Sequence, residues 1–201
     1  MDRLKAFKKF PELKTKRLVL REITLADTEW YLRHFSTDEI VRGQGYPGPL
    51  GFKEARAELE KYFVDLFKER NGFRWGIEIK GEDRLIGSLG FYKWVKPAGL
   101  QAEMGYDLDP EYWSRGIMRE AMTAVIDFGF KRMKLNRIEV LIMTRNRRSA
   151  VLVKGLGFEK EGVLREHGYD ENMKLVDDVL YSLLKKEWSP RKRVKKRQVI
   201  V

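Results

Sequence analysis

The chain has 201 residues, of which 41 are basic and 30 are acidic, so its formal net charge is +11. An apolar fraction of 43% is typical of a globular domain, and the length allows a substantial buried core. The absence of cysteine excludes disulfides, thiolate metal sites and a cysteine nucleophile. No apolar run of about 18 residues occurs and residues 1–14 lack a signal-peptide core, which predicts a cytoplasmic protein without a membrane span.

The positive charge is concentrated at the two ends of the chain. Residues 1–21 contain eight basic and two acidic residues, and residues 189–201 contain six basic residues and no acidic one. The remaining residues, 27 basic and 28 acidic, are close to neutral. We therefore expect one domain over residues 1–188 and a basic tail over 189–201, with the two ends as candidates for contact with RNA or a ribosome.

Apolar spacing and turn residues predict the elements in the first part of the chain. In chain order, these are a strand over 18–23, a helix over 26–35, a second amphipathic helix over 52–70, and strands over 74–80, 85–94 and 102–108. The apolar stripe of the second helix includes Phe52, Leu59, Tyr62 and Phe63. A short link at Gly81 predicts a hairpin between the first two strands of the final group.

After a turn at 109–111 the periodicity changes. The sequence predicts a helix that follows Gly116 and ends near 133, a buried strand over 137–143, a short helix over 149–154 and a closing strand over 179–184. The expected fold class is mixed α/β. A largely antiparallel meander would come first, followed by a strand–helix–strand crossover.

The segment 106–121 places a strand end, a turn and Gly116 directly before a helix. Free backbone N–H groups and the positive end of a helix dipole can bind a pyrophosphate at such a junction. Arg115 and Arg119 add positive charge beside it. A single glycine before a helix is also compatible with an ordinary turn, so the spacing alone leaves both interpretations open.

This segment resembles the acetyl-CoA pyrophosphate loop of the GNAT acetyltransferase superfamily, and its Tyr112-Trp113 pair is similar to the RimJ/RimL-like branch. Three further stretches agree in order and spacing, namely 15–21, 146–158, which ends in Gly-Phe, and 177–188. The resemblance covers about residues 13–188. It implies the GNAT fold, a central, mostly antiparallel twisted sheet that is splayed between its middle strands and flanked by helices.

The resemblance implies acetyl-CoA as co-substrate and no metal. The residues implied to bind acetyl-CoA are Trp113, Ser114, Arg115, Gly116, Ile117, Met118, Arg119, Asn146 and Ser149. Met118 stands where the family pattern has a small residue, but the contacts implied for the loop are mainly to backbone N–H groups. Asn146 is implied to contact the pantetheine arm.

The implied reaction is direct attack of an amine on the thioester, which requires a neutral amine, a stabilised oxyanion and a proton for the departing thiolate. Many GNAT enzymes supply that proton from a tyrosine, but its position here is Val153, and the resemblance assigns the role to Ser149. Capping of its helix is a compatible structural role for Ser149. Glu103 is the first candidate for the general base, with Glu166 and His167 as alternatives.

The leading functional interpretation is an N-acetyltransferase that acts on a primary amine, above all the α-amino group of a protein, including a ribosomal one. Acetylation of a polyamine or another small amine is the alternative within the same fold. Seven acidic residues over 159–178 fit a cationic acceptor, or a solvated surface equally well. Two other classes stay open: an RNA- or ribosome-binding module with a vestigial acyl-CoA pocket, and a non-catalytic acyl-CoA sensor. The sequence allows a monomer or a homodimer.

Overall fold

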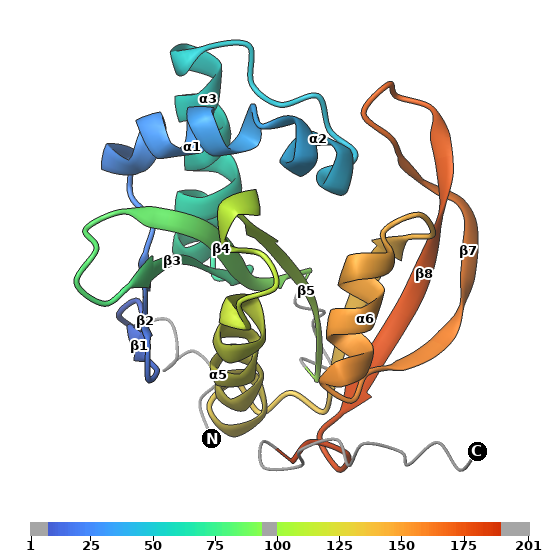
Figure 1. The fold of residues 1–201 in the computed structure, drawn as a ribbon. Helices are drawn as coiled ribbons and strands as arrows, with labels where there is room; N and C mark the ends of the chain where they lie inside the picture. Colours follow the sequence, from blue (N-terminus) through green and yellow to red (C-terminus); the bar gives the residue numbers. More distant parts are fainter. Residues whose placement is uncertain (1–7, 94–99, 190–201) are drawn as a thin grey trace.

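The computed structural model describes residues 8–93 and 100–189, which form one twisted sheet with helices on both faces (Figure 1). The strands are β1 (Leu13–Lys14), β2 (Leu18–Glu22), β3 (Phe73–Ile79), β4 (Leu85–Tyr92), β5 (Gln101–Leu108), β6 (Arg137–Met143), β7 (Glu159–Tyr169) and β8 (Leu175–Leu184). The helices are α1 (Thr28–Phe35), α2 (Asp38–Gln44), α3 (Phe52–Leu59), α4 (Asp65–Lys68), α5 (Ile117–Lys131) and α6 (Arg147–Gly155). Shorter turns are η2 (Leu25–Asp27), the π-helical η3 (Glu60–Val64) and η4 (Pro110–Tyr112).

The eight strands follow the order β1-β2-β3-β4-β5-β6-β8-β7. Neighbours in this sheet are antiparallel except for β5 and β6, which are parallel and joined through α5. The antiparallel meander followed by a strand–helix–strand crossover is therefore confirmed. The hairpin at Gly81 is also present, between β3 and β4.

The parallel pair opens along its length. β5 and β6 pair from Gln101 opposite Arg137 to Glu103 opposite Glu139, and the register ends there. β5 continues to Leu108 in full register with β4. The second half of β5 therefore has β4 on one side and a gap on the other, which confirms the splayed sheet.

The two faces of the sheet carry separate apolar clusters. Trp75 of β3 is fully buried in the larger cluster, which also contains the inner side of α5, including Met122. Side chains alternate along a strand, so Arg74 points to the opposite face, where its guanidinium lies 5.1 Å from the centre of the Phe63 ring. Phe63 belongs to the second cluster, together with α1 and α3. The sheet is therefore covered on both sides.

Three local features differ from the sequence prediction. Residues 38–44 form α2, which the sequence analysis missed because the segment buries only Ile40. β7 was also missed, because its side chains are mostly exposed. Phe52 and Tyr62 were placed on the buried stripe of the second helix, but they are 51% and 52% exposed. The placement of both residues on that stripe was wrong: Phe52 is the first residue of α3, and Tyr62 lies in the π-helical turn η3, which interrupts the 3.6-residue period.

No helix within the described parts of the chain combines the length and apolar character needed to cross a membrane. The same residues contain no cluster of three or more histidine and carboxylate side chains that could hold a metal ion. Apart from Ser189, the predicted basic tail over 189–201 lies outside the described residues, as do residues 1–7 of the basic N-terminal end.

Candidate functional site

A cavity of about 910 Å³ lies where β5 and β6 part. Its walls come from β5, the loop before α5, the start of α6 and the β7–β8 hairpin, and its size is that of a small-molecule site. It gathers these predicted site residues: Glu103, Trp113, Ser114, Gly116, Ile117, Met118, Arg119, Asn146 and Ser149. The structure describes every residue predicted to be catalytic or to bind the cofactor, and of these Arg115 is the one that does not line the cavity.

The loop before α5 turns through left-handed backbone and leads into the first turn of the helix. Ser114 and Gly116 both have left-handed backbone, with φ of 61° and 73°, and Gly116 is the N-cap of the 15-residue helix α5. The side chains of Ile117 and Met118 are 4% and 7% exposed and belong to the core. The free N–H groups of the first turn and the helix dipole favour an anion. The loop thus fits a pyrophosphate group, and the bulk of Met118 is accommodated within the core.

Positively charged side chains near the loop have specific partners. The Arg115 guanidinium lies 5.4 Å from the centre of the Tyr112 ring. Arg119 donates from Nη1 to the carbonyl oxygen of Gly155 at 2.6 Å and so connects α5 to the end of α6. A third arginine, Arg148, stacks over the indole of Trp113 at 3.6 Å and lines the cavity. The sequence analysis did not identify this stack, since its partners lie on different elements.

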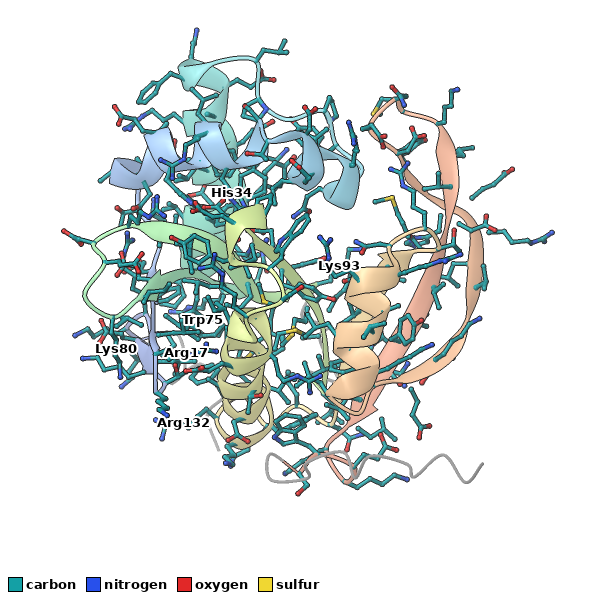
Figure 2. The ribbon with its side chains drawn as sticks, viewed as in Figure 1. Arg17, His34, Trp75, Lys80, Lys93 and Arg132 are labelled. Atoms are coloured by element: carbon teal, nitrogen blue, oxygen red, sulfur yellow. The ribbon has the colours of Figure 1, made fainter. Side chains whose placement is uncertain are left out.

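The loop is braced from the N-terminal strands. Arg17 donates from Nη1 to the carbonyl oxygen of Arg115 at 3.0 Å and pairs through Nε with Glu120 at 2.7 Å (Figure 2). Thr15 donates to the same carboxylate at 2.6 Å. Burial would raise the pKa of Glu120, but these hydrogen bonds outweigh it and lower the pKa. Residues 15–17 therefore support the loop from outside, a role that the sequence analysis did not assign to them.

The open edge of β5 presents a backbone donor to the cavity. The carbonyl oxygen of Leu100 accepts from the N–H of Arg137 at 3.0 Å and therefore faces β6. Alternate residues of a strand direct their backbone groups to the same edge. The N–H group of Met104 takes part in the last pairing of the ladder, Glu103 with Glu139, so the N–H group of Tyr106 is the one that points to the gap that β6 leaves open. Such a donor can stabilise a developing oxyanion.

Glu103 lies at the last position where β5 pairs with β6. Its carboxylate forms an ion pair with Lys93 at 2.9 Å, and its side chain is 11% exposed. Burial raises the pKa of Tyr92, and a hydrogen bond with Glu103 raises it further. All three residues line the cavity, and Lys93 is labelled in Figure 2.

Ser149 does not cap its helix. The N-cap of α6 is Asn146, whose Oδ1 accepts from the backbone N–H of Ser149 at 3.1 Å. The alternative structural role of Ser149 as the cap of α6 is therefore excluded, because Ser149 is the third residue of the helix. Its Oγ instead forms a short hydrogen bond with the hydroxyl group of Tyr106. Tyr106 was not among the predicted site residues.

The β7–β8 hairpin places a histidine at the opposite wall. A register shift in β7 between Leu164 and Gly168 brings Nδ1 of His167 to 2.9 Å from Oδ2 of Asp178, and both residues line the cavity. A side chain at Gly168 would place its Cβ 2.8 Å from that carboxylate oxygen, so glycine leaves room for Asp178. Glu166 does not line this cavity, and its backbone N–H donates to a neighbouring aspartate.

Three of the acidic residues over 159–178 hold the hairpin to residues near β6 or form its turn. Glu161 pairs with Arg137 at 2.6 Å, and Glu171 pairs with Arg145. Asp170 accepts two backbone N–H bonds in the turn. Of the seven acidic residues, all described, Asp178 alone lines the cavity. The segment therefore gives little support to an acidic rim for a cationic acceptor.

A buried ionic network around His34, which is labelled in Figure 2, anchors α1 to the end of β5. His34 is fully buried and contacts Asp107 through Nε2 at 2.8 Å and Asp109 through Nδ1. Arg74 pairs with Asp107, and Ser88 donates to the same carboxylate from its backbone N–H at 2.8 Å. Burial would lower the pKa of His34, but the two carboxylates raise it to about 9. Arg74 and His34 in turn overcome the burial of Asp107 and lower its pKa.

Known proteins show the same sequence pattern and the same architecture. Residues 17–159 match the family model of the acetyltransferase (GNAT) domain. The chain is 38% identical over 176 residues to the uncharacterized N-acetyltransferase YoaA of Bacillus subtilis, which covers 88% of this chain and 98% of the relative. It is 29% identical over 185 residues to the ribosomal protein uS5-alanine N-acetyltransferase of Escherichia coli. This match covers 89% of this chain and 93% of that relative. The crystal structure of the ribosomal-protein-S5-alanine acetyltransferase from Vibrio fischeri has a TM-score of 0.77 at 26% identity and covers 90% of this chain and 100% of that one.

Proposed function

The chain belongs to the acetyltransferase (GNAT) family and is an acetyl-CoA-dependent N-acetyltransferase, and we propose that its acceptor is the α-amino group of a protein N-terminus. A ribosomal protein is the first candidate. The observation that supports the reaction is the shared cavity, which brings together the loop before α5, the open edge of β5 and Ser149. The support for the acceptor is the likeness to a relative named as a ribosomal-protein alanine acetyltransferase.

The residues present fit acetyl-CoA, which supplies an acetyl group activated as a thioester. The backbone N–H groups that follow Gly116 would hold the pyrophosphate, with Arg148 as an additional positive group. The free end of the Asn146 side chain would contact the pantetheine arm, because its Oδ1 is used by the helix cap. The N–H group of Tyr106 would stabilise the oxyanion.

Two side chains would move protons. Glu103 takes a proton from the attacking amine, directly or through a water molecule, and its position on the splayed strand places the carboxylate at the cavity wall. Ser149 holds a proton at Oγ for the departing sulfur. Of the two alternative bases, His167 is better placed than Glu166, since its ring is oriented by Asp178 and lines the same cavity. Glu166 lacks this placement.

Steady-state release of CoA with different acceptors tests the proposal. Peptides that begin with Ala or Ser should be acetylated at higher kcat/KM than spermidine, and the same peptides with a blocked N-terminus should be inert. A higher kcat/KM for spermidine would favour the small-amine alternative. Thermal stabilisation by acetyl-CoA without turnover of any amine would indicate an acyl-CoA sensor.

Contact of the basic ends with a ribosome or RNA is a separate proposal, supported by the charge of residues 1–21 and 189–201. Deletion of residues 189–201 should weaken binding to ribosomes at low salt and should reduce its dependence on salt concentration. Binding that survives this deletion unchanged would argue against a role for the tail.

A further inference from the structure

Two hydroxyl groups meet inside the cavity from elements that lie far apart in the sequence. The hydroxyl of Tyr106 and Oγ of Ser149 form a short hydrogen bond across a separation of 43 residues. Tyr106 lies in the part of β5 beyond its last pairing with β6, and Ser149 lies in the first turn of α6. Both residues line the cavity. The bond thus joins the open strand edge to the helix on the other side of the gap.

The backbone fixes the position of Ser149. Its N–H donates to Oδ1 of Asn146 at 3.1 Å, which holds the residue in the capped first turn and leaves Oγ directed to Tyr106. The first turn of a helix favours negative charge, because the helix dipole is positive there. An atom that gains negative charge beside Ser149 is therefore stabilised by the same turn.

Tyr106 keeps its proton at physiological pH. Burial raises the pKa of its hydroxyl to about 12, and the hydrogen bond with Ser149 opposes this rise only in part. The group is therefore a neutral donor throughout the working range. It can donate to Oγ of Ser149 while the serine donates its own proton elsewhere, which a serine without such a neighbour cannot do without becoming an alkoxide.

We propose that Tyr106 acts through Ser149 as the second member of a proton relay to the departing sulfur. This inference rests on the proposed function, in which Ser149 gives up that proton. As the C–N bond forms and the electron pair of the C–S bond passes to sulfur, Ser149 transfers its Oγ proton to the sulfur and takes the hydroxyl proton of Tyr106. Tyr106 then recovers a proton from water. Glu103 releases to water the proton that it took from the amine, and this balances the proton that Tyr106 takes up.

Tyr106→Phe removes the hydroxyl and keeps the ring. With acetyl-CoA and an acceptor peptide, kcat should fall about 10- to 100-fold while KM for acetyl-CoA changes less than about twofold. Tyr62→Phe is the matched control, because Tyr62 is exposed and lies outside the cavity, and it should keep the wild-type kcat. An unchanged kcat in Tyr106→Phe, or a rise in KM alone, would overturn the relay.

Equilibrium binding gives a readout that does not depend on turnover. CoA carries the terminal sulfur and desulfo-CoA lacks it, so the ratio of their Kd values measures how well the protein stabilises the sulfur. Calorimetry at about pH 8.5, where a thiol with an ordinary pKa is partly ionised, should give a ratio of about fivefold or more for the wild type. For Tyr106→Phe the ratio should be less than about twofold. Equal ratios in the two proteins would contradict the proposal.

A double variant separates a relay from two independent effects. If Tyr106 acts through Ser149, the variant Ser149→Ala/Tyr106→Phe should have nearly the kcat of Ser149→Ala alone. Multiplication of the two single losses would overturn the relay. If the wild type releases no CoA with any amine, the proposed function itself fails. Wild-type turnover together with an unaffected Tyr106→Phe would refute the relay alone.

Discussion

The buried network around His34 makes folding stability depend on pH in a way that can be calculated. The perturbation is deprotonation of His34, whose pKa is about 9 in the folded protein against 6.5 for an unperturbed histidine. Below about pH 6.5 the imidazole is charged in both the folded and unfolded states, and the contribution of the network is fully present. Between about pH 6.5 and 9 the unfolded chain loses the proton and the folded protein keeps it, so stability falls as the pH rises.

The pKa difference sets the size of the effect. At about 1.4 kcal/mol for each pKa unit, it corresponds to about 3 kcal/mol of stability that is present at about pH 6 and absent at about pH 9.5. His34 is fully buried, so solvent screening does not reduce this figure much. It is a large fraction of the 5 to 15 kcal/mol that stabilises an ordinary domain. The loss should therefore be visible in a simple unfolding experiment.

Urea unfolding of the wild type and of His34→Gln at about pH 6, 7.5 and 9.5 provides the assay. The glutamine amide can still donate to a carboxylate but does not titrate. The difference in free energy of unfolding between the two proteins should therefore be largest at about pH 6 and should shrink by about 3 kcal/mol by about pH 9.5. Equal pH dependence in both proteins would refute the reasoning.

If His34→Gln does not fold, NMR of the His167→Ala variant measures the pKa of His34 directly, because the chain contains two histidines and the imidazole signal of His34 alone would remain. Titration of that signal near pH 6.5 instead of near 9 would equally refute the account.

Three further substitutions test the cofactor site. Gly116→Asp should raise the Kd for acetyl-CoA more than tenfold relative to Gly116→Asn, because both residues tolerate the left-handed backbone there and only the aspartate repels an anion; equal affinities in an equilibrium titration would overturn the loop assignment. Arg148→Ala should raise the same Kd several-fold and change the fluorescence of Trp113, whereas Arg148→Met, which keeps the apolar stem, should restore packing without restoring affinity. Ser149→Ala should lower kcat about 100-fold with little change in KM for acetyl-CoA, and wild-type activity across the pH range would remove Ser149 from the mechanism.

Local patterns in the sequence predicted the elements that hold the cofactor loop. The strand over 137–143 has the bounds of β6, because Ile138, Val140 and Ile142 recur with the two-residue period of a strand and are all buried. The glycine before α5 was identified for the same kind of local reason, since the residue at position 116 must adopt a positive φ. Segments with strong local preference were thus predictable without the fold.

Contacts between distant residues could not be predicted in this way. Tyr106 and Ser149 meet because β5 diverges from β6 and leaves space for α6, and no spacing within either segment carries that information. His34 and Asp107 are 73 positions apart, so no local spacing indicates that this histidine is buried with two carboxylate partners. The register shift that places His167 on Asp178 likewise depends on the pairing of β7 with β8.

The most direct test of the central claim is tandem mass spectrometry of one peptide incubated with the protein and acetyl-CoA. The peptide should begin with alanine and contain one internal lysine, so that it offers an α-amino group and a side-chain amine together. We predict one acetyl group on the N-terminal α-nitrogen. Acetylation of the lysine alone, or no acetylation in a preparation that binds acetyl-CoA, would contradict the proposed function.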